Sequence, residues 1–83
     1  MNDGEVIEIT LLAFGPLAEV LGWKRHQITL QNQHNMNQVL HILNLEGWKE
    51  KGLIVALNGI HCNLDTELNN GDEVALLPPV SGG

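Results

Sequence analysis

The sequence is poor in the residues that build disulfide networks, nucleic-acid surfaces and membrane spans. It has one cysteine, and its four lysines and arginines face ten acidic residues, which gives a formal net charge of −6. A lone Cys62 cannot form an internal disulfide, and a negative field repels phosphate backbones and anionic membranes. No apolar run approaches the roughly 20 residues needed to cross a bilayer. We therefore expect neither nucleic-acid binding nor membrane insertion.

Export signals are also missing from the start of the chain. The opening sequence MNDGEVIEIT has neither the basic start nor the apolar segment of a signal peptide, so we expect a cytoplasmic protein. At 83 residues the chain has room for one small domain with one core. So small a body seldom encloses a deep substrate cavity, which favours a protein that works with partners over a self-sufficient enzyme.

The potential metal ligands do not form a recognisable pattern. The histidines lie on separate predicted elements without metal-ligand spacing, so no metal site is predicted. Cys62 could relay sulfur, but a cysteine in a short strand is more often a small buried hydrophobe. The four histidines are His26, His34, His41 and His61.

What the sequence does have is regular apolar patterning. Pro16 and Gly22 bracket a short predicted helix. Asn35 is suited to cap the main helix, in which apolar residues recur at i, i+3, i+4 and i+7 and which we expect to end near Gly47. Alternating or continuous apolar residues predict strands over 6–14, 26–30, 53–57, 60–62 and 73–77.

The order of these elements indicates the fold. The chain is predicted to form two strands, a main helix, two further strands and a final strand, with the helix lying across a mixed sheet. This order resembles the β-grasp arrangement of ubiquitin-like proteins. We therefore predict an α+β fold with a β-grasp domain over residues 1–77. Residues 78–83 are predicted to form an extended C-terminal tail.

The tail ends in two glycines after a rigid Pro78-Pro79 exit. Prolines cannot continue a helix or donate to a sheet ladder, so the last strand must stop and the chain must leave as an extended arm. Six residues reach roughly 20 Å at about 3.3 Å per residue. Because Gly82 and Gly83 lack side chains, a narrow channel in a partner can close around them.

The carboxylate of Gly83 is the predicted reactive group. A carboxylate is a poor electrophile, but ATP can convert it to an acyl-adenylate, after which a persulfide can displace AMP and leave a thiocarboxylate. The alternative is that Gly-Gly is simply a frayed terminus. A frayed end accounts for neither the Pro-Pro exit nor its coincidence with a β-grasp pattern.

Two segments carry a family resemblance. VALNG at residues 55–59 and NNGDEVALLPPVSGG at residues 69–83 resemble the MoaD branch of the MoaD/ThiS sulfur carriers, the small subunits of molybdopterin synthase. The resemblance covers nearly the whole chain, with a looser match over LAFGPLAEVLG at residues 12–22. One departure is Ala18, where many relatives have an arginine, which puts in doubt any ion pair that the arginine makes.

This resemblance implies a cycle that depends on partners. An E1-like, MoeB-like enzyme would use ATP to adenylate Gly83, and a sulfurtransferase would supply sulfur. The tail would then insert into a MoaE-like large subunit, in an expected heterotetramer, and two transfers to cyclic pyranopterin monophosphate would build the molybdopterin dithiolene. The substrate pocket would lie in the large subunit, and no cofactor is expected to be bound permanently. The residues expected to insert ahead of Gly83 are Pro78, Pro79, Val80, Ser81 and Gly82.

A docking surface is predicted near the root of the tail. Strand alternation sends Phe14 and Leu77 away from the core face, and the first and last strands of a β-grasp sheet are parallel neighbours, so these side chains could share an exposed apolar patch. The resemblance implies that both contact partners and places His61 near a partner-facing position. The alternative is that Phe14 and Leu77 pack under a local loop.

Two other functions share the same chemistry. A sulfur carrier for thiazole synthesis, ThiS-like, also ends in Gly-Gly but by resemblance usually lacks PPVSGG. A ubiquitin-like modifier would form isopeptide bonds with protein lysines, as some archaeal relatives do. Both begin with the same adenylate, so the tail alone leaves them open.

Overall fold

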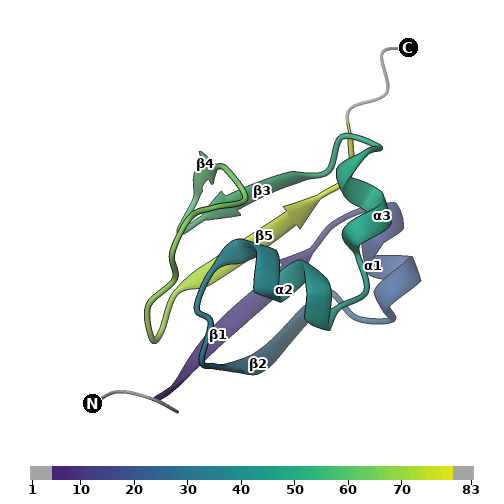
Figure 1. Ribbon diagram of the computed structural model, residues 1–83. Helices are drawn as coiled ribbons and strands as arrows, with labels where there is room; N and C mark the ends of the chain where they lie inside the picture. The colour runs from purple at the N-terminus through teal and green to yellow at the C-terminus, as the bar shows by residue number, and fades with distance from the viewer. Residues whose placement is uncertain (1–4, 80–83) are drawn as a thin grey trace.

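The computed structural model describes residues 5–79 of the chain (Figure 1). All five predicted strands are present, with bounds that differ from the prediction by at most one residue at either end. None of the helices between residues 5 and 79 is long and apolar enough to cross a bilayer. The elements are β1 (Val6–Ala13), α1 (Pro16–Leu21), β2 (Arg25–Gln31), α2 (Met36–Ile42), α3 (Glu46–Lys49), β3 (Ile54–Leu57), β4 (Ile60–Cys62) and β5 (Glu73–Leu77).

The strands form one mixed sheet in the order β2-β1-β5-β3-β4. β1 and β5 pair in parallel at its centre, and every other pair is antiparallel. β5 therefore lies between two antiparallel pairs of strands. The pair β1 and β2 is on one side of it, and the pair β3 and β4 is on the other. This topology confirms the predicted α+β fold of the β-grasp type.

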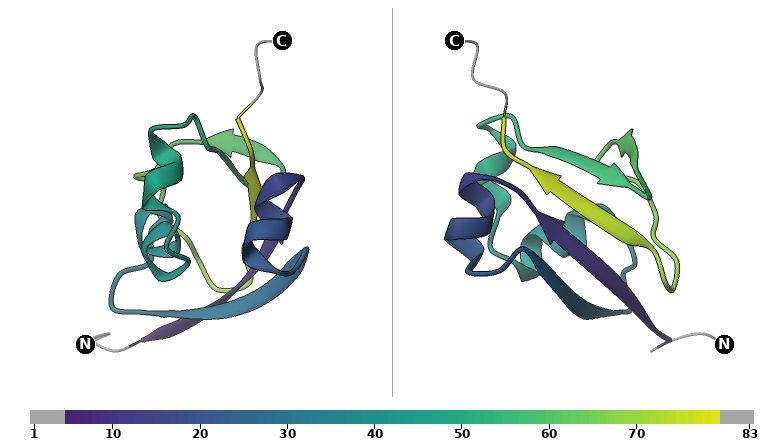
Figure 2. Two further views of the ribbon diagram at one scale, coloured as in Figure 1. Left: turned by 90° about the vertical axis from the view of Figure 1, so that its right-hand side faces the viewer. Right: turned by 180° about the vertical axis from the view of Figure 1, so that it is seen from behind.

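The core lies between the sheet and the helices on one of its faces (Figure 2). Alternation along β1 buries Ile7, Ile9 and Leu11 while Val6 and Glu8 stay exposed, because successive side chains of a strand point to opposite faces. The helices, the other strands and the segments before α3 and before β5 complete the same cluster. They contribute Leu17, Leu30, Met36, Val39, Leu40, Leu45, Val55, Leu68, Val74 and Leu76.

The predicted end of the main helix is wrong. α2 ends at Ile42 instead of near Gly47, because Asn44 adopts a left-handed conformation with φ of 59°. The Asn44 N–H donates to the His41 carbonyl at 3.1 Å, and the Leu45 N–H donates to the Leu40 carbonyl at 2.8 Å. This pair of bonds is a Schellman motif, which satisfies the last carbonyls of the helix and turns the chain. A separate short helix, α3, follows.

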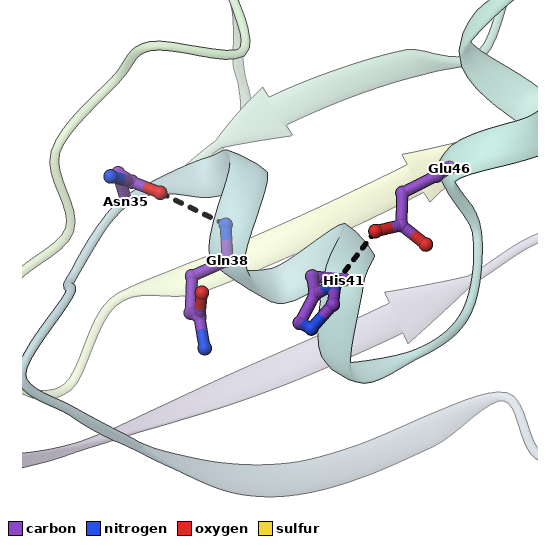
Figure 3. A network of polar contacts seen from close by, with 4 residues as sticks. All are labelled: Asn35, Gln38, His41 and Glu46. Atoms are coloured by element: carbon purple, nitrogen blue, oxygen red, sulfur yellow. Dashed lines mark hydrogen bonds and ion pairs between the residues drawn. The ribbon is translucent and has the colours of Figure 1, made fainter.

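Polar contacts fix both ends of α2 (Figure 3). At its start the Asn35 side chain accepts a hydrogen bond of 2.9 Å from the Gln38 N–H, as predicted for the cap. At its end His41 Nδ1 lies 2.7 Å from Glu46 Oε2, and this hydrogen bond lowers the pKa of Glu46. The stabilisation that this hydrogen bond gives the folded chain is present above the ordinary pKa of Glu46 and is lost as the pH falls through the lowered pKa. Both side chains are exposed, so the link between α2 and α3 is weak.

Replacing Asn35 with alanine is expected to lower the free energy of unfolding by about 1 kcal/mol, because an orphan N–H at the start of α2 loses its acceptor. Urea unfolding of the purified chain measures this change. Asn35→Ser is the matched control, since serine caps about as well as asparagine and should stay within a few tenths of a kcal/mol. Equal losses in both variants would mean that the cap is not the cause.

Candidate functional site

The last strand delivers the tail at one end of the sheet. β5 ends at Leu77, and Pro78 and Pro79 are half-buried immediately beyond it. Figure 1 shows this exit at the opposite end of the molecule from the start of β1. The other predicted tail residues, Val80, Ser81, Gly82 and Gly83, lie outside the described residues, so their roles stay predictions.

Two glycines that the sequence pattern does not single out border the tail root. Gly15 follows β1 and Gly52 precedes β3. A Cβ on Gly15 would lie 3.4 Å from Pro78 Cγ, and a Cβ on Gly52 would lie 3.2 Å from Pro79 Cβ. The predicted topology contained half of this arrangement: the first and last strands were expected to be parallel neighbours, which brings the end of β1 beside the end of β5, whereas the pairing of β3 with β5 was not predicted.

The face of the sheet opposite α2 carries an apolar surface that we call the open-face patch. Leu12 is paired with Ala75, and Ile54 with Leu77, so each pair shares this face. Phe14 continues the same alternation and is 46% exposed, so it does not pack under a local loop. The right-hand view of Figure 2 shows this face with α2 behind it. The patch consists of Leu12, Phe14, Ile54, Ala75 and Leu77.

His61 lies at the edge of the same face. His61 is paired with Ala56, and Ala56 is paired with Ala75. Ala75 is paired with Leu12 of the patch, so all four residues lie on the same face of the sheet. The His61 side chain is exposed on the edge strand β4. A polar contact between His61 and a partner at the border of the patch, which the family resemblance implied, stays a prediction. Ile54, which was not predicted, lies closer to Leu77 because the two residues are cross-strand partners.

An open groove of about 700 Å³ borders the patch. It shares Leu12 and Phe14 with the patch and is lined on the side of α1 by Ala18 and Glu19. Ala18 contributes a methyl group to this lining.

The remaining reactive side chains are occupied in local contacts. His26 stacks on Trp23 with ring centroids 5.1 Å apart, and His34 Nε2 lies 3.1 Å from the Glu5 carbonyl oxygen. Cys62 is half-buried against the core. Between residues 5 and 79 no three His, Cys, Asp or Glu side chains come together as a metal site would require. In this part of the chain, the features that point to a function are the tail root and the open-face patch.

The sheet order of a β-grasp domain and a last strand that ends beside an exposed apolar patch are typical of one class, the ubiquitin-like proteins. Within that class the chain belongs to the ThiS family, whose family model matches residues 11–83. It is thus a member of the ThiS/MoaD group of sulfur-carrier and ubiquitin-like proteins. A comparison with curated proteins finds no match.

Solved structures of similar chains come from more than one branch of this group. A chain of the complex of subunits 1 and 2 of molybdopterin-converting factor from Helicobacter pylori is 32% identical, with a TM-score of 0.64, and the match covers 93% of this chain and 100% of that one. SAMP1 from Haloferax volcanii is 25% identical with a TM-score of 0.74, over 92% and 99% of the two chains. The HVO 2177 protein of the same organism is 27% identical with a TM-score of 0.81, over 94% and 88%.

Proposed function

We propose that this chain is the sulfur-carrying small subunit of a molybdopterin synthase. The observation that carries the proposal is its similarity, over nearly the full length of both chains, to a chain of the Helicobacter pylori molybdopterin-converting factor complex. That relative was solved as a protein-protein complex of subunits 1 and 2. By analogy the partner of this chain is a MoaE-like large subunit, and the open-face patch is the surface that meets it.

The proposed chemistry takes place on the Gly83 carboxylate. An E1-like enzyme transfers AMP from ATP to the carboxylate and releases pyrophosphate, which turns a poor electrophile into an acyl-adenylate. A persulfide from a sulfurtransferase attacks the acyl carbon and expels AMP, which leaves an acyl disulfide. A second thiol then attacks the enzyme-side sulfur of that disulfide, so a new disulfide forms on the sulfur donor and the thiocarboxylate is released. The thiocarboxylated tail inserts into the large subunit and gives its sulfur to cyclic pyranopterin monophosphate, and water replaces the sulfur on Gly83 to restore the carboxylate. Two such transfers form the dithiolene.

A protein modifier is the second candidate. It is favoured by the similarity to SAMP1 of Haloferax volcanii, which is a small archaeal modifier protein. The two functions share the adenylate and diverge in its fate, since a modifier passes its acyl group to a lysine amine. A ThiS-like carrier for thiazole synthesis would form the same thiocarboxylate but bind a different partner. The protein that co-purifies with the chain therefore separates the two sulfur carriers.

Chain purified from its native cells is expected to contain a fraction about 16 Da heavier than the sequence mass, because sulfur replaces one oxygen of the Gly83 carboxylate. Intact-mass spectrometry measures this fraction. Methionine oxidation adds nearly the same mass, so the gain must be located. Cleavage after Glu73 releases residues 74–83, which contain neither methionine nor cysteine, and the extra mass is expected in this peptide.

The same measurement distinguishes the competing functions. Lysine-linked adducts without any thiocarboxylate would favour the modifier. A chain deleted of Gly83 and expressed in the same cells is the control, because it should show no heavy form of its C-terminal peptide. A heavy form that persists in the deleted chain would contradict the assignment of sulfur to Gly83.

A further inference from the structure

We propose that Gly52, together with Gly15, is a positioning residue that sets the direction in which the tail leaves the domain. The inference rests on the proposed function, because the direction of the tail matters only if its end must enter another protein's active site. It concerns residues of the domain itself, away from the reacting carboxylate.

The topology places the two glycines on opposite sides of the tail root. β5 lies between β1 and β3 in the sheet. Gly15 follows the end of β1, which is parallel to β5, and Gly52 precedes the start of β3, which is antiparallel to it. Pro78 therefore lies against the first glycine and Pro79 against the second. The tail leaves between two loops that have no side chain at the point of contact.

Gly52 is the tighter of the two contacts. A Cβ there would lie 3.2 Å from Pro79 Cβ, a distance at which one of the two groups must move. Pro79 Cβ belongs to a ring that fixes φ and cannot rotate away. The loop is also held, because the Gly52 N–H donates to the Lys49 carbonyl at 3.2 Å and the Leu53 N–H donates to the Trp48 carbonyl at 3.1 Å. An alanine at position 52 is therefore accommodated by a shift of the tail.

Gly15 limits the tail on the other side. A Cβ at this position would lie 3.4 Å from Pro78 Cγ, at ordinary contact distance. Its backbone, with φ of 57° and ψ of −136°, is in a region that is open almost only to glycine. Substitution at either glycine strains the backbone, but Gly52 has the tighter contact with the tail and a glycine of similar φ elsewhere in the chain, Gly71, as its control, so Gly52 is the better position for a test.

A small change at the root is amplified along the tail. The four residues beyond Pro79 span up to roughly 13 Å when extended, so a rotation of about 10° at the root moves the far end by about 2 Å. Misplacement of a reacting group by about 1 Å can cost on the order of a hundredfold in rate. Because Gly15 and Gly52 have no side chains, Pro78 and Pro79 pack closely against the two loops, and this packing fixes the direction in which the tail leaves the domain.

The test compares Gly52→Ala with Gly71→Ala in the full chain. Gly71 has φ of 89°, close to the 95° of Gly52, but a Cβ there meets no atom within 4 Å. It precedes β5, at the end of that strand away from the tail. Both variants place a side chain at a similar positive φ, so both are expected to lower the urea midpoint. Only Gly52→Ala is expected to slow adenylation by the E1-like enzyme, by roughly tenfold or more in kcat with KM within about twofold.

A second variant separates contact from strain. Pro79→Gly removes the Cβ that alanine at position 52 would meet, so Gly52→Ala in that background is expected to lower kcat by less than about twofold relative to Pro79→Gly alone. In the unsubstituted chain, nuclear Overhauser contacts are expected between the α-protons of Gly52 and the β-protons of Pro79. Absence of these contacts would therefore test the positioning role even if Gly52→Ala does not fold.

The outcomes are distinguishable. An unsubstituted chain that no E1-like enzyme adenylates would overturn the proposed function. If the unsubstituted chain is adenylated but Gly52→Ala and Gly71→Ala behave alike, only the positioning role is overturned. A folded unsubstituted chain without the contact between Gly52 and Pro79 would overturn it as well.

Discussion

Deleting Gly83 is expected to abolish molybdopterin formation in a reconstituted assay with the large subunit, the E1-like enzyme, a sulfur donor, ATP and cyclic pyranopterin monophosphate. The expected loss is complete, because under the proposed function this carboxylate is the only group that accepts AMP and then sulfur. Deletion leaves a carboxylate on Gly82, one residue short of the reacting position. A displacement of about 3.3 Å is far beyond the tolerance of a preorganised site.

The deletion should leave the domain intact. The described core extends from Ile7 to Leu76, and β5 ends at Leu77, so loss of residue 83 removes no member of either. The urea midpoint is therefore expected to be unchanged and the Kd for the large subunit to stay within about threefold, because the open-face patch is retained. Retained synthesis of molybdopterin by a chain without Gly83 would contradict the assignment.

The strands could be predicted because turn residues delimit segments of alternating polarity or, over residues 53–57, a short continuous apolar run. β5 has the predicted bounds, since Val74 and Leu76 alternate with Ala75 and Leu77 before two prolines. The end of α2 could not be found in the same way, because Leu43 and Leu45 continue an apolar pattern past the true end. The deciding residue is Asn44, which tolerates a left-handed conformation. Apolar spacing alone therefore predicts helix through the residue that ends it.

Side-chain directions that follow from alternation within one strand could be predicted from the sequence. Contacts that depend on how two strands are paired could not. The outward direction of Phe14 and Leu77 follows from alternation within β1 and β5. The inclusion of Ile54 and the contacts of Gly15 and Gly52 depend on the register between strands, and periodicity within a single strand does not define that register. His61 was placed only by a rough motif alignment. The structure locates it on the patch face through its pairing with Ala56.

Replacing Phe14 with glutamate is expected to weaken binding to the large subunit by about 3 kcal/mol, roughly a hundredfold in Kd. Phe14 is 46% exposed in the free chain, so the domain can accept the charge without burying it. Under the proposed function the side chain becomes buried against an apolar partner surface, where an unpaired carboxylate is costly and an aromatic contact is lost. Leu77→Glu should weaken binding in the same direction, with more loss of stability because Leu77 is half-buried. Isothermal titration with the large subunit measures both.

Ile42→Glu is the matched control for this substitution. Ile42 is 43% exposed and lies on α2, which covers the face of the sheet opposite the open-face patch. Ile42→Glu adds the same negative charge as Phe14→Glu to a chain whose formal charge is already −6. Any general electrostatic effect on association therefore appears in both variants. Binding is expected to change by less than about twofold for Ile42→Glu. Equal affinities for Phe14→Glu and Ile42→Glu would remove the open-face patch as the docking surface, while the chemistry of Gly83 would remain to be judged by its own deletion.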